Sequence, residues 1–379
     1  MIRERAYLDW NASTPLRPEA RAAMLGVLDQ IGNPSSVHRE GRAARAITET
    51  ARAQIAALLG CDPAAIVFTS GATEAASMAL SNRKAIAWPS DHDSVTAHAR
   101  VDGTRLGRDG RAIMPDLSSA GEQSVFDDVD IAALSHASGE TGIIQPVEDL
   151  LALATSRQPR LPTLCDISQT LGRMPLEFGS KPLAGSGLDL AICSAHKLGG
   201  PKGVGALVIL GDHRPPALLR GGGQESGHRS GTENVAGIAG FGAAAEAARR
   251  EVENGAWERV AHLRDLLEER LESAAPDLIF MGKEAPRLPN TSCFALPGWT
   301  GETQVMQMDL GGFAVSAGSA CSSGKVRRAS PVLLAMGFDE TTASSAIRVS
   351  IGPTTTEDQV MAFADTWISR YHRRGERAA

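Results

Sequence analysis

The sequence predicts an α/β fold in which a mostly parallel, mixed sheet lies between helices, because short apolar runs alternate with helical patterns. The runs at 65–68 and 203–210 are short and free of charged residues, which is typical of buried strands. From Ala44 to Leu58, apolar residues recur every three or four positions, and Gly60 follows shortly afterwards. This spacing predicts an amphipathic helix that ends at the glycine.

The length of 379 residues suits two packed domains better than one simple core. After about residue 245 the pattern changes to a long charged helix with one apolar face, from Val260 to Leu271. We therefore expect a large domain at residues 16–245. A smaller α+β domain is expected to combine residues 1–15 with residues 246–379.

The charge balance argues against nucleic acid or a membrane as a direct partner. The chain has 38 basic and 44 acidic residues, a formal net charge of −6, so no basic field attracts phosphate groups. The first residues lack the apolar core of a signal peptide, and no run of about 18 uncharged apolar residues occurs. These features predict a cytoplasmic protein whose partners are small molecules or other proteins.

The cysteines are few, odd in number and without a Cys-x-x-Cys pair, which argues against a disulfide framework and against a zinc site. At least one thiol must therefore be free. The five are Cys61, Cys165, Cys193, Cys293 and Cys321.

Three strand ends carry residues suited to chemistry. The turn at 69–74 places a hydroxyl and free backbone N–H groups where a phosphate could bind, although simple helix capping is the alternative. Lys197 ends an apolar strand, where partial desolvation would lower the pKa of its amine as a nucleophile requires; a solvated lysine is the alternative. Asp166 follows another strand and, if buried, needs a cation such as a protonated cofactor ring nitrogen; a helix N-cap is the alternative.

Five motifs occur in a fixed order over nearly the whole chain, and together they resemble those of the cysteine desulfurases of the NifS/IscS type. This family lies within the class V aminotransferase-like, fold-type I enzymes that use pyridoxal phosphate (PLP). The opening residues 7–15 and the turn 32–36 also resemble the family's amino-terminal signatures. The motifs are Gly71-Ala72-Thr73-Glu74, Asp166-x-x-Gln169, Ser194-x-His196-Lys197, Arg229-Ser230-Gly231-Thr232 and Gly318-Ser319-Ala320-Cys321.

The resemblance implies a role for each cofactor-binding residue. Lys197 forms the covalent link to PLP, Asp166 pairs with the ring nitrogen and Gln169 hydrogen-bonds the ring hydroxyl. His92 stacks on the ring and moves protons. The phosphate meets residues of one subunit and one residue of a second, which implies a homodimer; these are Ala72, Thr73, Ser194 and His196 of the first subunit and Thr232 of the other.

The resemblance also implies the substrate contacts and the nucleophile. Arg348 takes the carboxylate of L-cysteine in a bidentate fork, a geometry that lysine cannot supply, with a structural salt bridge as the alternative. Asn33 is a second substrate-binding residue. Cys321 lies in a small-residue segment that matches the long-loop, group I enzymes. It takes the substrate sulfur as a persulfide for an acceptor protein while alanine leaves, and the other four cysteines pack in the interior.

The chain departs from the family at Ser138-Gly139, where two asparagines are usual. The change removes a donor near Arg348, and losing a hydrogen bond to a charged group costs about 1.5–3 kcal/mol. Two other functions compete: a selenocysteine lyase or other class V PLP enzyme, which needs no thiol at Cys321, and a PLP-binding pseudoenzyme that acts as a scaffold. The acceptor stays open among an iron–sulfur scaffold, a nucleic-acid thiolation enzyme and a cofactor pathway.

Overall fold

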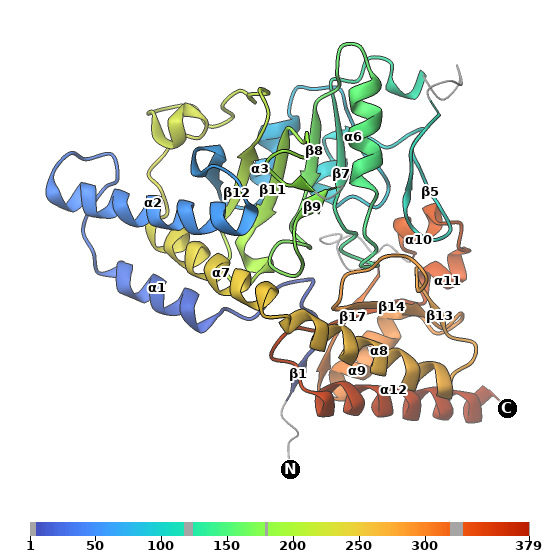
Figure 1. Cartoon of the computed structure of the whole chain (residues 1–379). Helices are drawn as coiled ribbons and strands as arrows, with labels where there is room; N and C mark the ends of the chain where they lie inside the picture. Colours follow the sequence, from blue (N-terminus) through green and yellow to red (C-terminus); the bar gives the residue numbers. More distant parts are fainter. Residues whose placement is uncertain (1–4, 117–123, 179–180, 319–328, 379) are drawn as a thin grey trace.

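A seven-stranded sheet forms the centre of the molecule in the computed structural model, which describes residues 5–116, 124–178, 181–318 and 329–378 (Figure 1). The strand order is β2-β12-β11-β8-β7-β3-β4. Only β12 runs antiparallel to its neighbours in this sheet, so the predicted mostly parallel α/β fold is confirmed. The strands are β2 (Ile66–Thr69), β3 (Ala85–Ile86), β4 (Ala99–Arg100), β7 (Ile131–Ser135), β8 (Thr163–Asp166), β11 (Leu190–Ser194) and β12 (Gly205–Ile209).

Helices cover both faces of this sheet, and alternate strand residues point to opposite faces. Phe68 and Ala206 pack on one face with residues of α2, α6 and α7. Val67 and Leu207 pack on the other face with the alanine-rich α3. The helices on this sheet are α1 (Pro18–Leu28), α2 (Arg39–Leu59), α3 (Ala72–Leu80), α4 (Asp93–Thr96), α6 (Val147–Ser156) and α7 (Val235–Glu253).

The predicted amphipathic helix is present as α2, and it is longer than its apolar spacing indicated. It begins at Arg39, after the N-cap His38, whose ring accepts a hydrogen bond from the Gly41 N–H. It ends where predicted, because Gly60 adopts the left-handed conformation (φ 64°) that closes a helix without strain. Its buried face packs against α7, and α7 also packs against α1.

A second, antiparallel sheet lies beside the first in the order β13-β14-β17-β16. The amino-terminal strand β1 (Ala6–Tyr7) pairs with β15 (Phe313–Ala314), so the start of the chain lies among residues from its carboxyl-terminal part. The remaining elements of this region are β13 (Ile279–Phe280), β14 (Thr291–Ala295), β16 (Ser316–Ala317), β17 (Ala346–Ser350), α8 (Ala256–Ala274), α9 (Gly301–Leu310), α10 (Pro331–Ala335), α11 (Glu340–Ser344) and α12 (Glu357–Ala378).

The connection between the two sheets runs through α7 and α8; in Figure 1, α7 lies below the large sheet and α8 below the second one. Residue 245 lies inside α7, so the domain division proposed there stays a prediction. Four short 3-10 turns and two small hairpins complete the described structure. They are 63–65, 124–126, 195–197 and 224–227, with β5 (Arg105–Leu106) paired to β6 (Ala112–Ile113) and β9 (Glu177–Phe178) paired to β10 (Lys181–Pro182).

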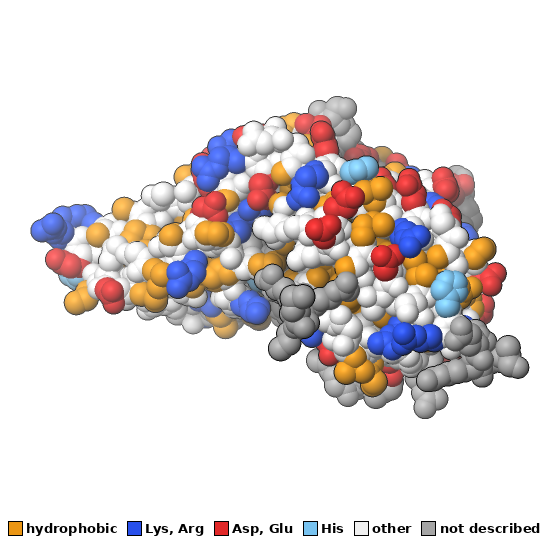
Figure 2. Space-filling model, turned by 90° about the horizontal axis from the view of Figure 1, so that it is seen from below, with side chains coloured by type: hydrophobic (Ala, Val, Ile, Leu, Met, Phe, Trp, Pro, Cys, Tyr) orange, Lys and Arg blue, Asp and Glu red, His pale blue; other side chains and the backbone are white. Residues whose placement is uncertain are grey.

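The surface carries both signs of charge. Figure 2 shows basic and acidic side chains interspersed on the lower face. One exposed pair, Arg270 with Asp365, joins α8 to α12 at 2.9 Å; such pairs contribute little stability in water. Within the described residues, no helix has the length and apolarity that crossing a membrane requires.

Candidate active site

The motif residues meet at the carboxyl edge of the large sheet because their strands are neighbours. Strand β8 ends at Asp166 and lies parallel to β11, which ends at Ser194 and continues directly into the 195–197 turn with Lys197. In open α/β sheets, ligands bind at this edge of the strands. The end of β2 joins the same region, since Thr69 pairs with Gly205 on β12, and Gly205 pairs with Ser194.

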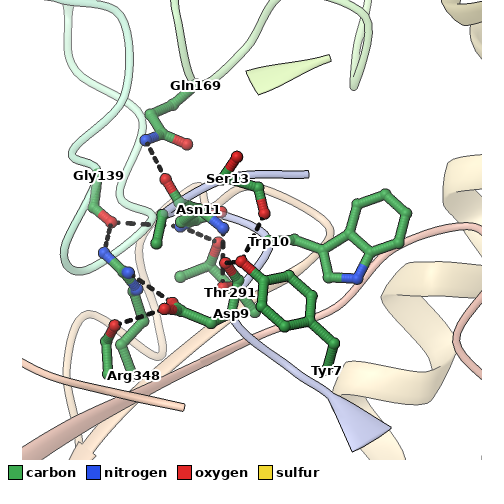
Figure 3. A network of polar contacts seen from close by, with 12 residues as sticks. Tyr7, Asp9, Trp10, Asn11, Ser13, Gly139, Gln169, Thr291 and Arg348 are labelled. Atoms are coloured by element: carbon green, nitrogen blue, oxygen red, sulfur yellow. Dashed lines mark hydrogen bonds and ion pairs between the residues drawn. The ribbon is translucent and has the colours of Figure 1, made fainter. Parts of the chain in front are cut away.

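Lys197 and Gln169 converge on one oxygen atom. The Lys197 Nζ donates to the backbone carbonyl of Asn11 at 2.5 Å, and the Gln169 Nε2 donates to the same carbonyl at 3.2 Å. Lys197 also donates to the carbonyl of Ala12 at 3.0 Å. Figure 3 shows the Gln169 amide pointing toward Asn11. The lysine amine and the glutamine donor are thus placed side by side, as one small ring system would require.

The other end of the site lies at the start of α3. The Ala72 N–H donates to the Ser194 Oγ at 2.8 Å, and the hydroxyl-bearing Thr73 next to it is exposed. Gly205 must be a glycine here, because a Cβ would lie 2.6 Å from the Gly71 Cα. A helix N-terminus with free N–H groups favours an anion. The structure therefore brings Ser194 into contact with Ala72, with Thr73 next in the chain, and their role in phosphate binding stays a prediction.

His196 lies next to this helix end, and its ring contacts the Ser13 Oγ at 3.3 Å. Burial, and then the neighbouring Lys197 cation, lowers the pKa of His196 to about 4, so the ring is neutral at pH 7. Thr232 is exposed in the loop before α7, and no described hydrogen bond joins it to these residues.

Asp166 is a buried acid whose described surroundings hold no cation. The residue is buried, and one carboxylate oxygen accepts the Ser168 N–H at 2.8 Å. Among the residues in the described ranges, no lysine, arginine or histidine nitrogen lies within 4 Å of the Asp166 carboxylate. The buried Ser168 hydroxyl also has no hydrogen-bond partner among the described residues. A buried acid of this kind fits a cationic ligand atom.

His92 caps the short helix α4, with its Nδ1 2.8 Å from the Ser94 Oγ. His92 is exposed, and its described hydrogen bonds are to Ser94. The preceding Asp91 is buried and accepts backbone N–H groups of Trp88 and Ser135. Asp91 therefore fastens the segment that carries His92 to the sheet.

Arg348 is buried on β17, and two groups hold its guanidinium. The Nη2 pairs with the Asp9 carboxylate at 2.8 Å, and the Nη1 donates to the Gly139 carbonyl at 2.7 Å (Figure 3). The structural salt bridge considered for this arginine is therefore present. Because the Gly139 carbonyl also accepts from the Asn11 Nδ2 at 3.2 Å, Arg348 joins the same network as Lys197.

Ser138 and Gly139 fill the positions where asparagines are usual. The Ser138 Oγ accepts the backbone N–H groups of Glu140 and Thr141, both at 3.3 Å, so this side chain closes its own turn. A Cβ at Gly139 would lie 3.1 Å from the Gln169 Nε2. Asn33 is exposed and accepts the Ser35 N–H, and no described contact joins it to Arg348.

Glu140 is a half-buried acid with one buried carboxylate oxygen, and burial raises its pKa to about 7 against the opposing effects of Ser330 and Arg348. The folded protein therefore binds this proton more tightly than the unfolded chain, whose glutamate has a pKa near 4.5. That contribution to stability is complete below about pH 4.5 and is lost as the pH rises through about 7.

Glu140→Gln should consequently flatten the dependence of stability on pH. We expect the melting temperature of the wild type to fall by several degrees more than that of Glu140→Gln between these two pH values. Thermal unfolding followed by circular dichroism at closely spaced pH values checks this. Parallel curves for the two proteins would contradict the assignment of the raised pKa.

Two residues of the site gave no signal of their own in the sequence. Asn11 is buried and links Lys197, Gln169 and Gly139 through its backbone carbonyl and its side chain. Arg173 is buried and contacts both Asn11 and Gln169. Asn11 lies in the recognised amino-terminal signature, which could have pointed to it, whereas Arg173 lies in a turn whose sequence shows no pattern that would have done so.

The described thiols are poor nucleophiles. Burial raises the pKa of Cys61 to about 11 and of Cys193 to about 12, and it also raises the pKa values of Cys165 and Cys293. Thiols of this kind stay protonated at neutral pH. Cys321 lies outside the described residues.

Comparisons with known proteins agree with the geometry. The family model "Aminotransferase class-V" matches residues 6–363. A cysteine desulfurase from Frankia sp. is 40% identical over 390 residues, covering 95% of this chain and 89% of that protein. An IscS-like cysteine desulfurase from Mycobacterium tuberculosis is 36% identical over 380 residues, covering 94% of each.

A solved structure shares the fold as well. The NifS-like protein from Rickettsia africae has a TM-score of 0.85 at 28% sequence identity, covering 97% of this chain and all of that one. The family match spans nearly the whole chain, and the motifs at 71–74, 166–169 and 194–197 lie at neighbouring strand ends. The chain belongs to the class V aminotransferase family and, within it, to the cysteine desulfurases.

Proposed function

We propose that this enzyme removes sulfur from L-cysteine, releases L-alanine and holds the sulfur as a persulfide on Cys321 for an acceptor protein. One observation carries the proposal. Asn11 joins the lysine that would bind the cofactor to the arginine that would bind the substrate, since its carbonyl accepts from Lys197 and its amide shares the Gly139 carbonyl with Arg348. The reacting amine and the carboxylate-binding group thus share one rigid support.

The described side chains fit PLP as the cofactor. Asp166 supplies a buried carboxylate without a described cation, and Gln169 supplies a donor beside the Lys197 amine. The start of α3, with Ala72 and Ser194, suits a phosphate group. When bound, PLP supplies an electron sink that makes the α-hydrogen of the substrate acidic.

The residues of this chain position the substrate and move its protons. Arg348, held by Asp9 and Gly139, would bind the substrate carboxylate and fix the α-carbon near Lys197. The Lys197 amine would take the α-proton, because its position beside Asn11 keeps it at the same end of the site. His92, on the segment fastened by Asp91, would act as the second proton carrier.

Cys321 would complete the reaction as a thiolate. Its Sγ attacks the substrate sulfur and forms the S–S bond of the persulfide while the bond from sulfur to the β-carbon breaks. The electron pair of that bond stays with the carbon fragment, which takes up protons and leaves as alanine. The product sulfur is then carried on the protein, ready for transfer to an acceptor thiol.

We further propose that the enzyme works as a homodimer. The loop between α1 and α2 projects from one end of the molecule (Figure 1), and its Ile31 and Val37 side chains are 87% and 86% exposed. Exposed apolar side chains on a projecting loop favour an interface with another chain. The exposed position of Thr232 agrees with a role toward a partner's phosphate site. A cytoplasmic location stays a prediction.

The direct test is product release from L-cysteine by purified protein with PLP and dithiothreitol. Alanine and sulfide are expected in equal amounts, with L-selenocysteine and other amino acids compared at the same concentration. Turnover of selenocysteine alone would make the enzyme a selenocysteine lyase. Absence of turnover with any substrate, despite bound PLP, would favour the scaffold alternative and overturn this proposal.

A further inference from the structure

Arg173 is a fully buried arginine with no acid in contact. It lies in the turn after β8, and its side chain is about as buried as the aromatic residues of the core. Its four acceptors are all neutral: the Asn11 Oδ1 at 2.7 Å, the Gln169 Oε1 at 2.9 Å, and the backbone carbonyls of Lys197 at 3.2 Å and Trp10 at 3.4 Å. Among the described residues, no carboxylate oxygen lies within 4 Å of its guanidinium.

A buried cation without a counter-ion is destabilising by itself, so its presence here calls for a physical role. Burial, followed by the nearby Arg348 cation, lowers the pKa of Arg173 to about 9, and the guanidinium therefore remains charged at pH 7. A charged donor makes stronger hydrogen bonds than a neutral one. Arg173 therefore fixes the positions of its four acceptor groups.

The most informative of these acceptors is the Gln169 side chain. A glutamine amide has a donor end and an acceptor end of nearly the same shape, so its orientation depends on its neighbours. Arg173 takes the Oε1, which leaves the Nε2 facing the Asn11 carbonyl beside the Lys197 amine. The reversed amide would set its own N–H groups against the guanidinium, which can only donate.

We propose that Arg173 is a positioning residue, which orients Gln169 so that an N–H group, and not a carbonyl oxygen, faces the ring oxygen of the cofactor. The inference rests on the proposed function, because it requires PLP linked to Lys197. Arg173 also donates to the backbone carbonyl of Lys197. The same guanidinium therefore fixes both Gln169 and Lys197, the two residues proposed to bind the cofactor. Gln169 contacts the cofactor itself, and Arg173 acts only through Gln169.

The test is a pH titration of the visible absorbance of the PLP-bound protein, which does not depend on turnover. An N–H donor to the ring oxygen stabilises its anionic form and lowers the pH at which the bound cofactor loses its proton. Arg173→Met should therefore move this titration upward by about 1–2 pH units, the size expected when a hydrogen bond to a charged group is lost.

Two further variants separate orientation from charge. Arg173→Lys keeps the positive charge but lacks the fork that reaches Asn11 and Gln169 together, so it should also move the titration upward. In a Gln169→Leu background, Arg173→Met should add less than half of its original shift, because its route through the amide is gone. Arg157→Met is the matched control: Arg157 is half-buried, donates to the Phe126 carbonyl and should cause no shift.

Each outcome decides the question. An unshifted titration in Arg173→Lys, or equal shifts with and without Gln169, would overturn the inference while leaving the proposed function intact. If Arg173→Met does not fold by circular dichroism, Arg173→Lys and its combination with Gln169→Leu give the same comparison. A wild-type protein that binds no PLP in the visible spectrum would instead refute the cofactor assignment on which the inference rests.

Discussion

Lys197→Ala should bind no PLP covalently and should lose its turnover of L-cysteine. The variant removes the amine that would link the cofactor and that would also move the α-proton, and loss of general acid–base catalysis alone lowers rates by about 10²–10⁴-fold. Because Lys197 donates to the Asn11 and Ala12 carbonyls from inside the site, no other described lysine shares its position. The absorbance of the dialysed protein and alanine release are the two measurements.

Lys202→Ala is the matched control for this variant. Lys202 lies five residues further along the chain and is exposed, so its removal should leave both the visible absorbance and the rate of the wild type. Stability should change little in either variant, because surface changes rarely exceed about 0.5 kcal/mol and Lys197 is only half-buried. A Lys197→Ala protein that is colourless but still active would show that the cofactor assignment is wrong.

The sequence predicted the strand ends of the site because they are local. The run 65–68 corresponds to β2 (Ile66–Thr69), and the run 203–210 contains β12 (Gly205–Ile209). The second prediction was two residues too long at its start, since Gly203 has a φ of 79° and belongs to the turn. A buried strand read only from its apolar residues cannot distinguish such a glycine from a strand residue.

Other elements could not be predicted, because their own sequences show no periodic pattern. Strands β3 and β4 have two residues each, too few to show any alternation. Helix α2 begins at Arg39, five residues before Ala44, the first apolar residue of the predicted pattern. This start could not be predicted, because His38 is not among the residue types that usually cap a helix. Strands β3 and β4 are instead held by pairing with strands that are distant in sequence or by each other.

Much of the support of the site comes from such distant contacts. Asn11 meets Gln169, Thr291 and the Gly139 carbonyl across separations of 128–280 residues. Arg173 contacts Asn11 across 162 residues, and nothing in its own segment distinguishes it from the many arginines on the surface. The residues proposed to touch ligands could be inferred from their motifs, whereas the residues that hold them in place required the folded chain.

Cys321→Ser should keep the visible absorbance of the wild type and lose sulfide release, by a factor on the order of 10³ or more, as expected for loss of a catalytic nucleophile. The described thiols cannot replace it. Cys165, Cys193 and Cys293 are buried, and burial raises the pKa of each, so their thiolate fractions are very small at neutral pH. A hydroxyl at position 321 is far less acidic than a thiol and cannot accept sulfur as a persulfide.

Cys61→Ser serves as the control, since Cys61 is the one described cysteine that is only half-buried, and burial raises its pKa to about 11. It should release alanine and sulfide as fast as the wild type. Mass spectrometry of protein treated with L-cysteine, without reductant, should find one extra sulfur atom on the wild type and on Cys61→Ser, and none on Cys321→Ser. Because Lys197, Gln169 and Arg348 are unaltered in all three proteins, a persulfide that persisted in Cys321→Ser would place the sulfur on another thiol and exclude the proposed nucleophile.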